Sequence, residues 1–229
     1  MGGVGVGMRN AAAVNLLNPA AYSAVRPKSF LFDFGLEGQC FYNSQKYYGQ
    51  TLNTSYYTVN FHDIAFQLPI AKHLGLGFSL TPYSSVGYRM KQEVDDDEIW
   101  GNIGRVQYQW DGDGDVTEVK LGLGWEIFRG FSIGIAAQYY WGDIQRIYKT
   151  AILENITGGG LIADATGTET YSVSRFKGQF GVQWSPISNR RRILTIGATY
   201  DIGGDLNPNV TTKVQTGDIF NTVAMDMGN

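Results

Sequence analysis

The chain has 229 residues with a formal net charge of -3, and 17% of them are charged, against roughly a quarter in an average soluble domain. No basic surface indicates nucleic acid as a partner, and the single cysteine, Cys40, excludes an internal disulfide and a cysteine-based zinc site. Every apolar run is broken before the roughly 18 residues that a membrane-spanning helix needs. Thirty glycines and fourteen tyrosines are instead typical of membrane β-strands, in which apolar residues alternate with small or polar ones.

Residues 1–28 are rich in Gly and Ala, show no apolar periodicity and contain the tripeptide Asn18-Pro19-Ala20. Pro19 fixes its own φ and disfavours helix at Asn18, so the chain is expected to turn there. Small residues would let this segment fit among the side chains of a barrel lumen. We therefore predict an N-terminal hatch over residues 1–28, with an ordinary N-terminal turn as the alternative.

From Ser29 onward, apolar residues alternate with small or polar ones, which predicts β-strands. In the third such run, for example, Leu76 and Phe78 alternate with Gly77 and Ser79. About seven strands are expected, over residues 30–39, 53–69, 74–81, 118–127, 131–141, 176–184 and 194–201. Because bacterial single-chain barrels close with an even number of strands, further C-terminal strands are expected beyond this chain.

The connections between these runs alternate between short and long. The short ones cover residues 71–73, 128–130 and 185–192. The long ones, rich in Gly, Asp and Asn, cover residues 43–52, 90–115 and 142–170. Outer-membrane barrels have short periplasmic turns and longer outer loops. The pattern predicts an all-β protein, a transmembrane antiparallel β-barrel in the outer membrane of a Gram-negative bacterium, surrounded by membrane lipid and lipopolysaccharide.

A Gly-rich opening that is followed by Asn18-Pro19-Ala20 and then by a first strand resembles the FadL family of outer-membrane transporters of hydrophobic compounds. The resemblance covers about the first forty residues by motif and the remainder by strand pattern. It implies a barrel of fourteen strands in full, with residues 1–28 as the hatch and residues 29–229 as the N-terminal half of the barrel wall.

For function, the resemblance implies a channel for passive uptake of hydrophobic or amphipathic small molecules such as fatty acids, with no cofactor. The alternative is a non-transporting barrel subunit of a larger outer-membrane secretion or assembly complex, which would bind other outer-membrane proteins. Ligand inside the barrel would favour the first reading, and a stable partner chain against the outer wall would favour the second.

Pro82 lies in a run that otherwise reads as a lipid-facing strand. Proline cannot donate to the strand ladder, so a bulge, a kink or a strand end is expected there. In the family that the chain resembles, the third strand is kinked and opens a lateral route to the membrane. The resemblance therefore implies a lateral kink at Pro82 and Gly87, with a plain strand end as the alternative.

Several polar side chains are expected to face the barrel lumen from their register in the strands. There they would pair with one another or with the N-terminal segment, or they would line a path for a solute. These residues are Asp33, Glu37, Glu118, Lys120, Glu126, Lys177 and Gln179.

No enzyme activity is expected, because the sequence carries no recognisable catalytic motif. The two histidines, His62 and His73, have no Ser or Cys partner suggested by spacing. The run Asp111 to Asp115 starts like a calcium-binding loop but has Val116 where that loop needs Gly. It is interpreted as a turn in an outer loop, with weak binding of a divalent ion as the alternative.

Overall fold

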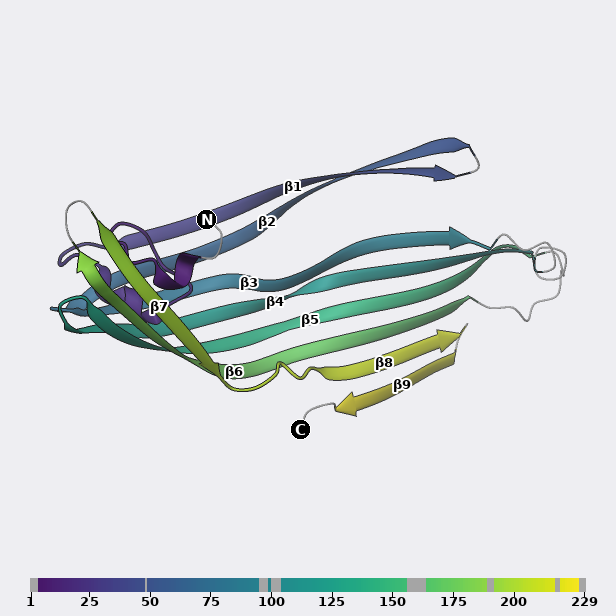
Figure 1. Ribbon diagram of the computed structural model, residues 1–229. Helices are drawn as coiled ribbons and strands as arrows, with labels where there is room; N and C mark the ends of the chain where they lie inside the picture. Colours follow the sequence, from purple (N-terminus) through teal and green to yellow (C-terminus); the bar gives the residue numbers. More distant parts are fainter. Residues whose placement is uncertain are drawn as a thin grey trace. The chain divides into compact units, whose positions relative to one another are not determined.

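The computed structural model describes residues 4–47, 49–94, 99, 104–155, 164–188, 192–216 and 219–226 (Figure 1). Its strands are β1 (Leu31–Tyr47), β2 (Gln50–Ala71), β3 (Leu74–Glu93), β4 (Gly104–Phe128), β5 (Phe131–Asn155), β6 (Ala165–Ser188), β7 (Ile193–Ile202), β8 (Asn209–Thr216) and β9 (Ile219–Asp226). Two short 3-10 helices, η1 (Val4–Gly7) and η2 (Pro19–Ala24), precede them. Among the described residues, no helix is long and apolar enough to cross a membrane.

The nine strands form one antiparallel sheet, which confirms the predicted all-β class. Neighbouring strands follow chain order from β1 to β6; β6 then pairs with both β7 and β8, and β9 pairs with β8 (Figure 1). Within the described part of the chain the sheet is not closed, because no pairing joins β1 to β9. The barrel and the hatch inside it therefore stay predictions.

Strands β7 and β8 pair with successive stretches of the same edge of β6. β7 lies opposite residues 178–188 of β6, and β8 lies opposite residues 165–172. The linker between them, residues 203–208, has one residue more than the stretch of β6 that it passes, so the chain bulges there. Gly203 and Gly204 in this linker have positive φ values of 132° and 66°, which glycine adopts without strain. The chain thus leaves the ladder with β6 after Ile202 and pairs with β6 again from Asn209.

The predicted number of strands and the predicted long loops were wrong. About seven strands were expected and the described part of the chain has nine, because β8 and β9 were missed. The described parts of the expected loops 90–115 and 142–170 lie mostly in β3 to β6, and residues 95–98, 100–103 and 156–163 of these loops lie outside the described residues. Most of the loop expected at 43–52 belongs to β1 and β2, which pair as far as Tyr47 and Gln50. In these stretches polar residues occupy both faces, as in the Asp-Gly run that begins at Asp111. The period-two contrast that marks a lipid-facing strand is therefore lost there.

The chain divides into two compact units. Unit 1 comprises Met1–Pro82, Glu118–Gln138 and Lys177–Gly203. Unit 2 comprises Tyr83–Thr117, Tyr139–Phe176 and Gly204–Asn229. Of the described strands, four contribute one stretch to each unit, namely β3, β4, β5 and β6.

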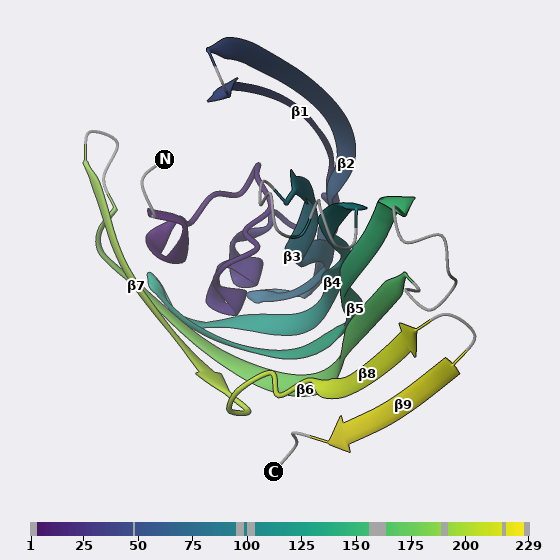
Figure 2. The same cartoon turned by 90° about the vertical axis from the view of Figure 1, so that its right-hand side faces the viewer.

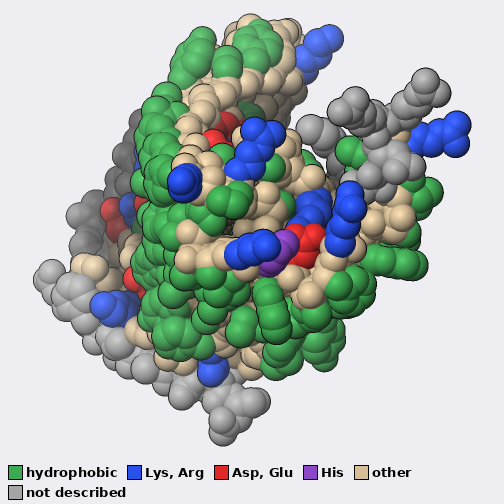
Figure 3. All heavy atoms as spheres, turned by 90° about the vertical axis from the view of Figure 1, so that its left-hand side faces the viewer, with side chains coloured by type: hydrophobic (Ala, Val, Ile, Leu, Met, Phe, Trp, Pro, Cys, Tyr) green, Lys and Arg blue, Asp and Glu red, His purple; other side chains and the backbone are tan. Residues whose placement is uncertain are grey.

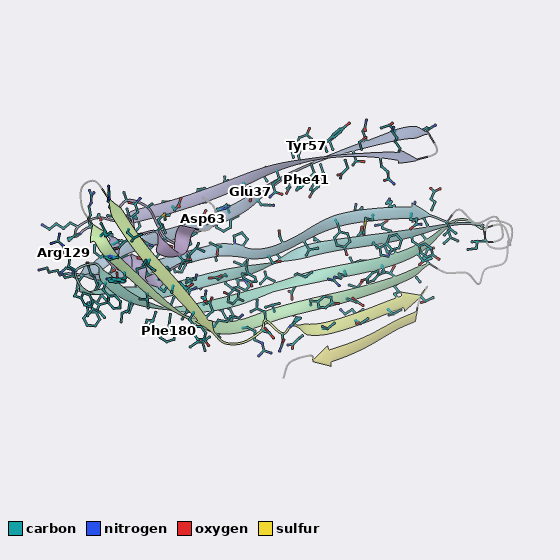
Figure 4. All side chains as sticks on the ribbon, in the orientation of Figure 1. Glu37, Phe41, Tyr57, Asp63, Arg129 and Phe180 are labelled. Carbon is teal, nitrogen blue, oxygen red and sulfur yellow. The ribbon has the colours of Figure 1, made fainter. Side chains whose placement is uncertain are left out.

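In unit 1 the two faces of the sheet differ in character. One face carries large exposed apolar side chains, such as those of Leu121, Trp125 and Phe180, each of them about half exposed. Figure 4 labels Phe180 on β6. The alternate residues on the same strands, such as Gly122 and Gln183, are buried beneath the N-terminal segment. Figure 2 shows the ribbon of this segment beside the strands that it covers. We call the covered face the inner face and the other the outer face. The N-terminal segment, residues 4–30, supplies the core of this unit, since Ala20, Ala21 and Tyr22 are among its most buried side chains.

Unit 2 has a small apolar core of its own. Val116, Tyr140 and Val173 are buried together, and Ile144 and Leu206 pack against them. Leu206 belongs to the linker between β7 and β8, so the bulge directs an apolar side chain into this core. The bulge is therefore a packing element and not merely an irregularity in the ladder.

Candidate functional site

The Asn-Pro-Ala tripeptide begins η2 and anchors it to the sheet. Asn18 has extended backbone angles and caps the helix, because its Oδ1 accepts a hydrogen bond from the backbone N–H of Ala20 at 2.9 Å. Pro19 follows at the first helical position, where its missing N–H costs nothing. The Asn18 Nδ2 group donates to the carbonyl oxygens of Val6 at 2.8 Å and Val182 at 3.2 Å. One fully buried side chain therefore joins η1, η2 and β6.

The segment lies against the sheet so closely that only glycine fits beneath it. A Cβ at Gly75 would overlap the backbone carbonyl of Tyr22, and a Cβ at Gly134 would overlap the backbone of Pro19 and Ala20. Tyr22 itself is 2% exposed and lies over Gly77. Burial raises the pKa of the Tyr22 hydroxyl far above its usual range, and the charge of Glu118 acts in the same direction. The alternating glycines that indicated strands thus also form the surface against which the N-terminal segment packs, which we call its seat.

Buried side chains of the sheet donate hydrogen bonds directly to the backbone of the segment. Gln183 Nε2 donates to the carbonyl oxygens of Val6 and Met8 at 3.0 and 3.1 Å. Gln67 Nε2 donates to the carbonyl oxygen of Asn15 at 3.2 Å. Because these amides are almost completely buried, they replace water as partners of the segment backbone.

A buried ion pair completes this interface. Lys120 Nζ donates to the carbonyl oxygen of Leu16 at 2.9 Å and lies 3.2 Å from Glu118 Oε1. The same Glu118 oxygen accepts a hydrogen bond from Gln138 Nε2 at 3.2 Å. The Lys120 and Glu118 side chains are only 6% and 11% exposed. Removing either partner would leave a buried charge without compensation, which is costly.

Arg9 makes a further set of contacts between the segment and the sheet. Its Nη1 donates to Ser132 Oγ at 2.5 Å and to Ser23 Oγ at 3.1 Å, and its Nη2 lies 3.6 Å from Glu126 Oε2. Glu126 also lies 3.2 Å from His73 Nδ1. Burial lowers the pKa of Arg9, while the charge of Glu126 raises it.

The other residues singled out from the sequence lie away from these contacts or at their margin. Asp33 and Glu37 are exposed on β1. By alternation with Gly181 and Gln183, both Lys177 and Gln179 share the inner face of β6, and Gln179 is buried.

Pro82 and Gly87 both lie in β3 and are exposed. β3 continues through both residues to Glu93, so the strand does not end at Pro82. Its pairing with β2 runs from Leu74 to Leu80, which leaves Pro82 just beyond the last pair of that ladder. The missing N–H of proline therefore interrupts none of those pairs.

Arg9, Tyr22 and Gln67 were missed by sequence reasoning. The one available signal was that Arg9 is the single charged residue among residues 1–25, in a stretch otherwise composed of small, apolar and amide side chains. A charge isolated in such a stretch needs a partner once it is buried. Nothing in the sequence indicated that Tyr22 lies over Gly77 or that Gln67 binds the backbone of Asn15.

The calcium-like run lies inside β4 and not in a turn, which corrects the sequence interpretation. Asp111 lies 3.0 Å from Arg89 Nε and 3.9 Å from Lys149 Nζ, and it accepts a hydrogen bond from Gln109 at 2.6 Å. Its carboxylate is thus paired with cationic side chains. Over the described ranges, no group of three or more His, Cys, Asp and Glu side chains could hold a metal ion.

A family model described as BamG matches residues 1–228 of the chain. No curated protein and no solved structure matches it. The resemblance to the FadL family was therefore wrong, and with it the prediction of fatty acid uptake. The physical reason lies in the motif: Asn18, Pro19 and Ala20 serve a local cap and turn, which chains of unrelated function can use.

The BamG family is associated with the outer membrane of Gram-negative bacteria, which confirms the predicted location. Its members associate with other outer-membrane proteins in a complex. This supports the prediction that the chain binds other outer-membrane proteins, and it leaves the predictions of membrane lipid, lipopolysaccharide and a hydrophobic small-molecule ligand as partners unsupported.

Proposed function

Because this chain belongs to the BamG family, we propose that it forms part of a non-transporting membrane subunit of the machinery that assembles outer-membrane proteins. The match over residues 1–228 is the observation that carries the proposal. In this role the protein binds other outer-membrane proteins and performs no covalent chemistry.

The proposed subunit is a β-barrel whose wall includes the strands of unit 1. Strands need about 9–11 residues to cross a membrane, and the unit 1 stretches of β4 and β7, residues 118–128 and 193–202, have this length. Their outer faces alternate apolar side chains such as Leu123 and Ile196 with inward small or polar ones. Further strands would close the sheet between β1 and β9, because open strand edges do not occur in hydrocarbon.

The N-terminal segment supports a role without transport. Gln67, Lys120 and Gln183 donate directly to its backbone from buried positions, and glycines of the sheet fit its contour. Moving the segment aside would break these hydrogen bonds, at about 0.5–1.5 kcal/mol net for each of them, and would also remove the packing of the buried Tyr22 against the sheet. In the proposed barrel, the segment is therefore a plug fixed to the inner face of the wall and does not act as a gate.

The test is to tag the full-length protein in its own host, isolate it in mild detergent and identify its partners, then to deplete it and quantify outer-membrane proteins. We expect a stable complex with other outer-membrane proteins, and lower levels of several unrelated barrels after depletion. Periplasmic and inner-membrane proteins serve as the internal control. A chain that purifies alone and whose depletion leaves all barrels at normal levels would refute the proposal.

A measurement of fatty acid uptake distinguishes the proposed assembly role from the transport role that the family match contradicts. Fatty acid uptake, measured in cells before barrel levels fall, should not change on depletion. An immediate loss of uptake without any loss of barrels would contradict a non-transporting role.

A further inference from the structure

A basic pocket lies at the end of unit 1 where the β2–β3 and β4–β5 turns are located. The pocket has a volume of about 820 Å³. Its ionisable lining residues are Arg9, Arg26, Lys72, His73, Glu126 and Arg129. Figure 3, which faces this end of the molecule, shows Lys and Arg side chains gathered around a histidine and an acidic side chain, and Figure 4 marks Arg129 at the turn. A cavity of this size lies within the range of sites that bind small molecules or peptide side chains.

The charges in this pocket do not cancel. Its one lining carboxylate, Glu126, is already bound by Arg9, by His73 and by the backbone N–H of Gly130. Three further cations, Arg26, Lys72 and Arg129, are exposed. Across the described residues, none of these three has an acidic partner. The pocket therefore presents a concentrated positive charge, although the chain as a whole has a net charge of -3.

Cations around a concave site attract anionic groups, and the low dielectric of the surrounding protein strengthens this attraction. The pocket also has apolar walls, to which Leu74, Pro186 and Ile193 contribute. Walls of this kind fit the carbon portion of an extended peptide whose acidic side chains reach the cations.

We propose that this pocket binds an acidic segment of a partner protein. The inference rests on the proposed function for the location of the pocket, because the short turns of an outer-membrane barrel face the periplasm. The occupant is then a periplasmic segment of another subunit. A protein segment is favoured over a lipid headgroup because the cations surround a cavity, whereas a bilayer surface is flat and would contact only their tips.

The binding test uses the purified full-length protein and a fluorescent hexaglutamate peptide, followed by anisotropy. We expect saturable binding that weakens with salt and falls at least about tenfold in the double variant Lys72→Glu and Arg129→Glu, because reversal turns two attractions into repulsions. The control Lys213→Glu reverses an exposed cation in unit 2 and should leave affinity within about twofold.

Two outcomes of this test would overturn the inference. The first is hexaglutamate binding that the double variant leaves unchanged. The second is no peptide binding, together with binding to phosphatidylglycerol vesicles that the same variant abolishes, which would assign the pocket to anionic lipid.

A crosslinking arm distinguishes failure of this inference from failure of the proposed function. A photo-crosslinker at position 72 of the full-length protein in cells should capture a peptide rich in Asp and Glu, and Arg129→Glu should reduce that capture. If the complex is isolated intact but no acidic peptide is captured, the inference fails and the proposed function stands. If hexaglutamate binds at the pocket but the chain never copurifies with outer-membrane proteins, the pocket stands and the proposed function fails.

Discussion

Replacing Asn18 with Ala should loosen the N-terminal segment, because the Asn18 side chain joins the segment to β6. The fully buried side chain makes three hydrogen bonds, to the backbone of Val6, Val182 and Ala20. A buried hydrogen bond contributes about 0.5–1.5 kcal/mol net, and loss of a helix cap alone costs about 1 kcal/mol. We therefore expect the free energy of opening the segment to fall by about 2–4 kcal/mol, which corresponds to roughly 30-fold to 1000-fold faster exchange of its amides.

The assay is hydrogen exchange with mass spectrometry on peptides of the segment, in the folded full-length protein. Asn10→Ala is the matched control, since Asn10 is exposed and its side chain accepts one local bond, from the N–H of Ala12 at 2.9 Å. Exchange in that variant should change by no more than about threefold. Equal exchange in the Asn18 variant and the wild type would refute the reasoning, because the segment would then not be held by the contacts described.

Three further predictions test the seat, the outer face and the bulge. Gly134→Val should displace η2 from the sheet, because a Cβ at this position would overlap the backbone of the segment. The control Gly38→Val should leave the segment in place, because nothing lies within 4 Å of a Cβ there. Faster protease cleavage within the segment of the Gly134 variant would report the displacement. Phe180→Arg should cost about 2–4 kcal/mol in refolding into lipid vesicles, and Phe176→Arg in unit 2 should cost less than half as much; equal losses would contradict the assignment of unit 1 to the membrane. Leu206→Ala should destabilise unit 2 by about 1–3 kcal/mol, measured as faster hydrogen exchange in β8, and unchanged exchange would show that the bulge does not support that strand.

The sequence predicted the strands of unit 1 well, because large apolar side chains on one face and small or polar residues on the other produce a period of two. Leu121 and Phe180 are half exposed, and the residues beside them are buried, as the alternation required. The parts of the strands in unit 2 lack that contrast. The Asp-Gly run from Asp111 therefore resembled a loop, although strand ladders form with almost any side chains once their neighbours are present.

The contacts of the N-terminal segment could be predicted only in part. The turn at Asn18 and Pro19 follows from local backbone chemistry, which acts over a few residues. The seat of Tyr22 over Gly77 depends on bringing β3 beneath the segment, and no local pattern encodes that distance. The family assignment failed for a related reason, since a motif that satisfies local chemistry carries little information about what the whole protein binds.

The long reach of Gln183 has a consequence for the order of folding. Its side chain binds the carbonyl oxygen of Val6, 177 residues earlier in the chain. Contacts between residues so far apart form late, because the entropy of closing the intervening chain must first be offset. The N-terminal segment is made first, yet it can be fully seated only after β6 has joined the sheet. Until then its backbone lacks these partners, so protection of the segment from proteases should mark the completion of unit 1.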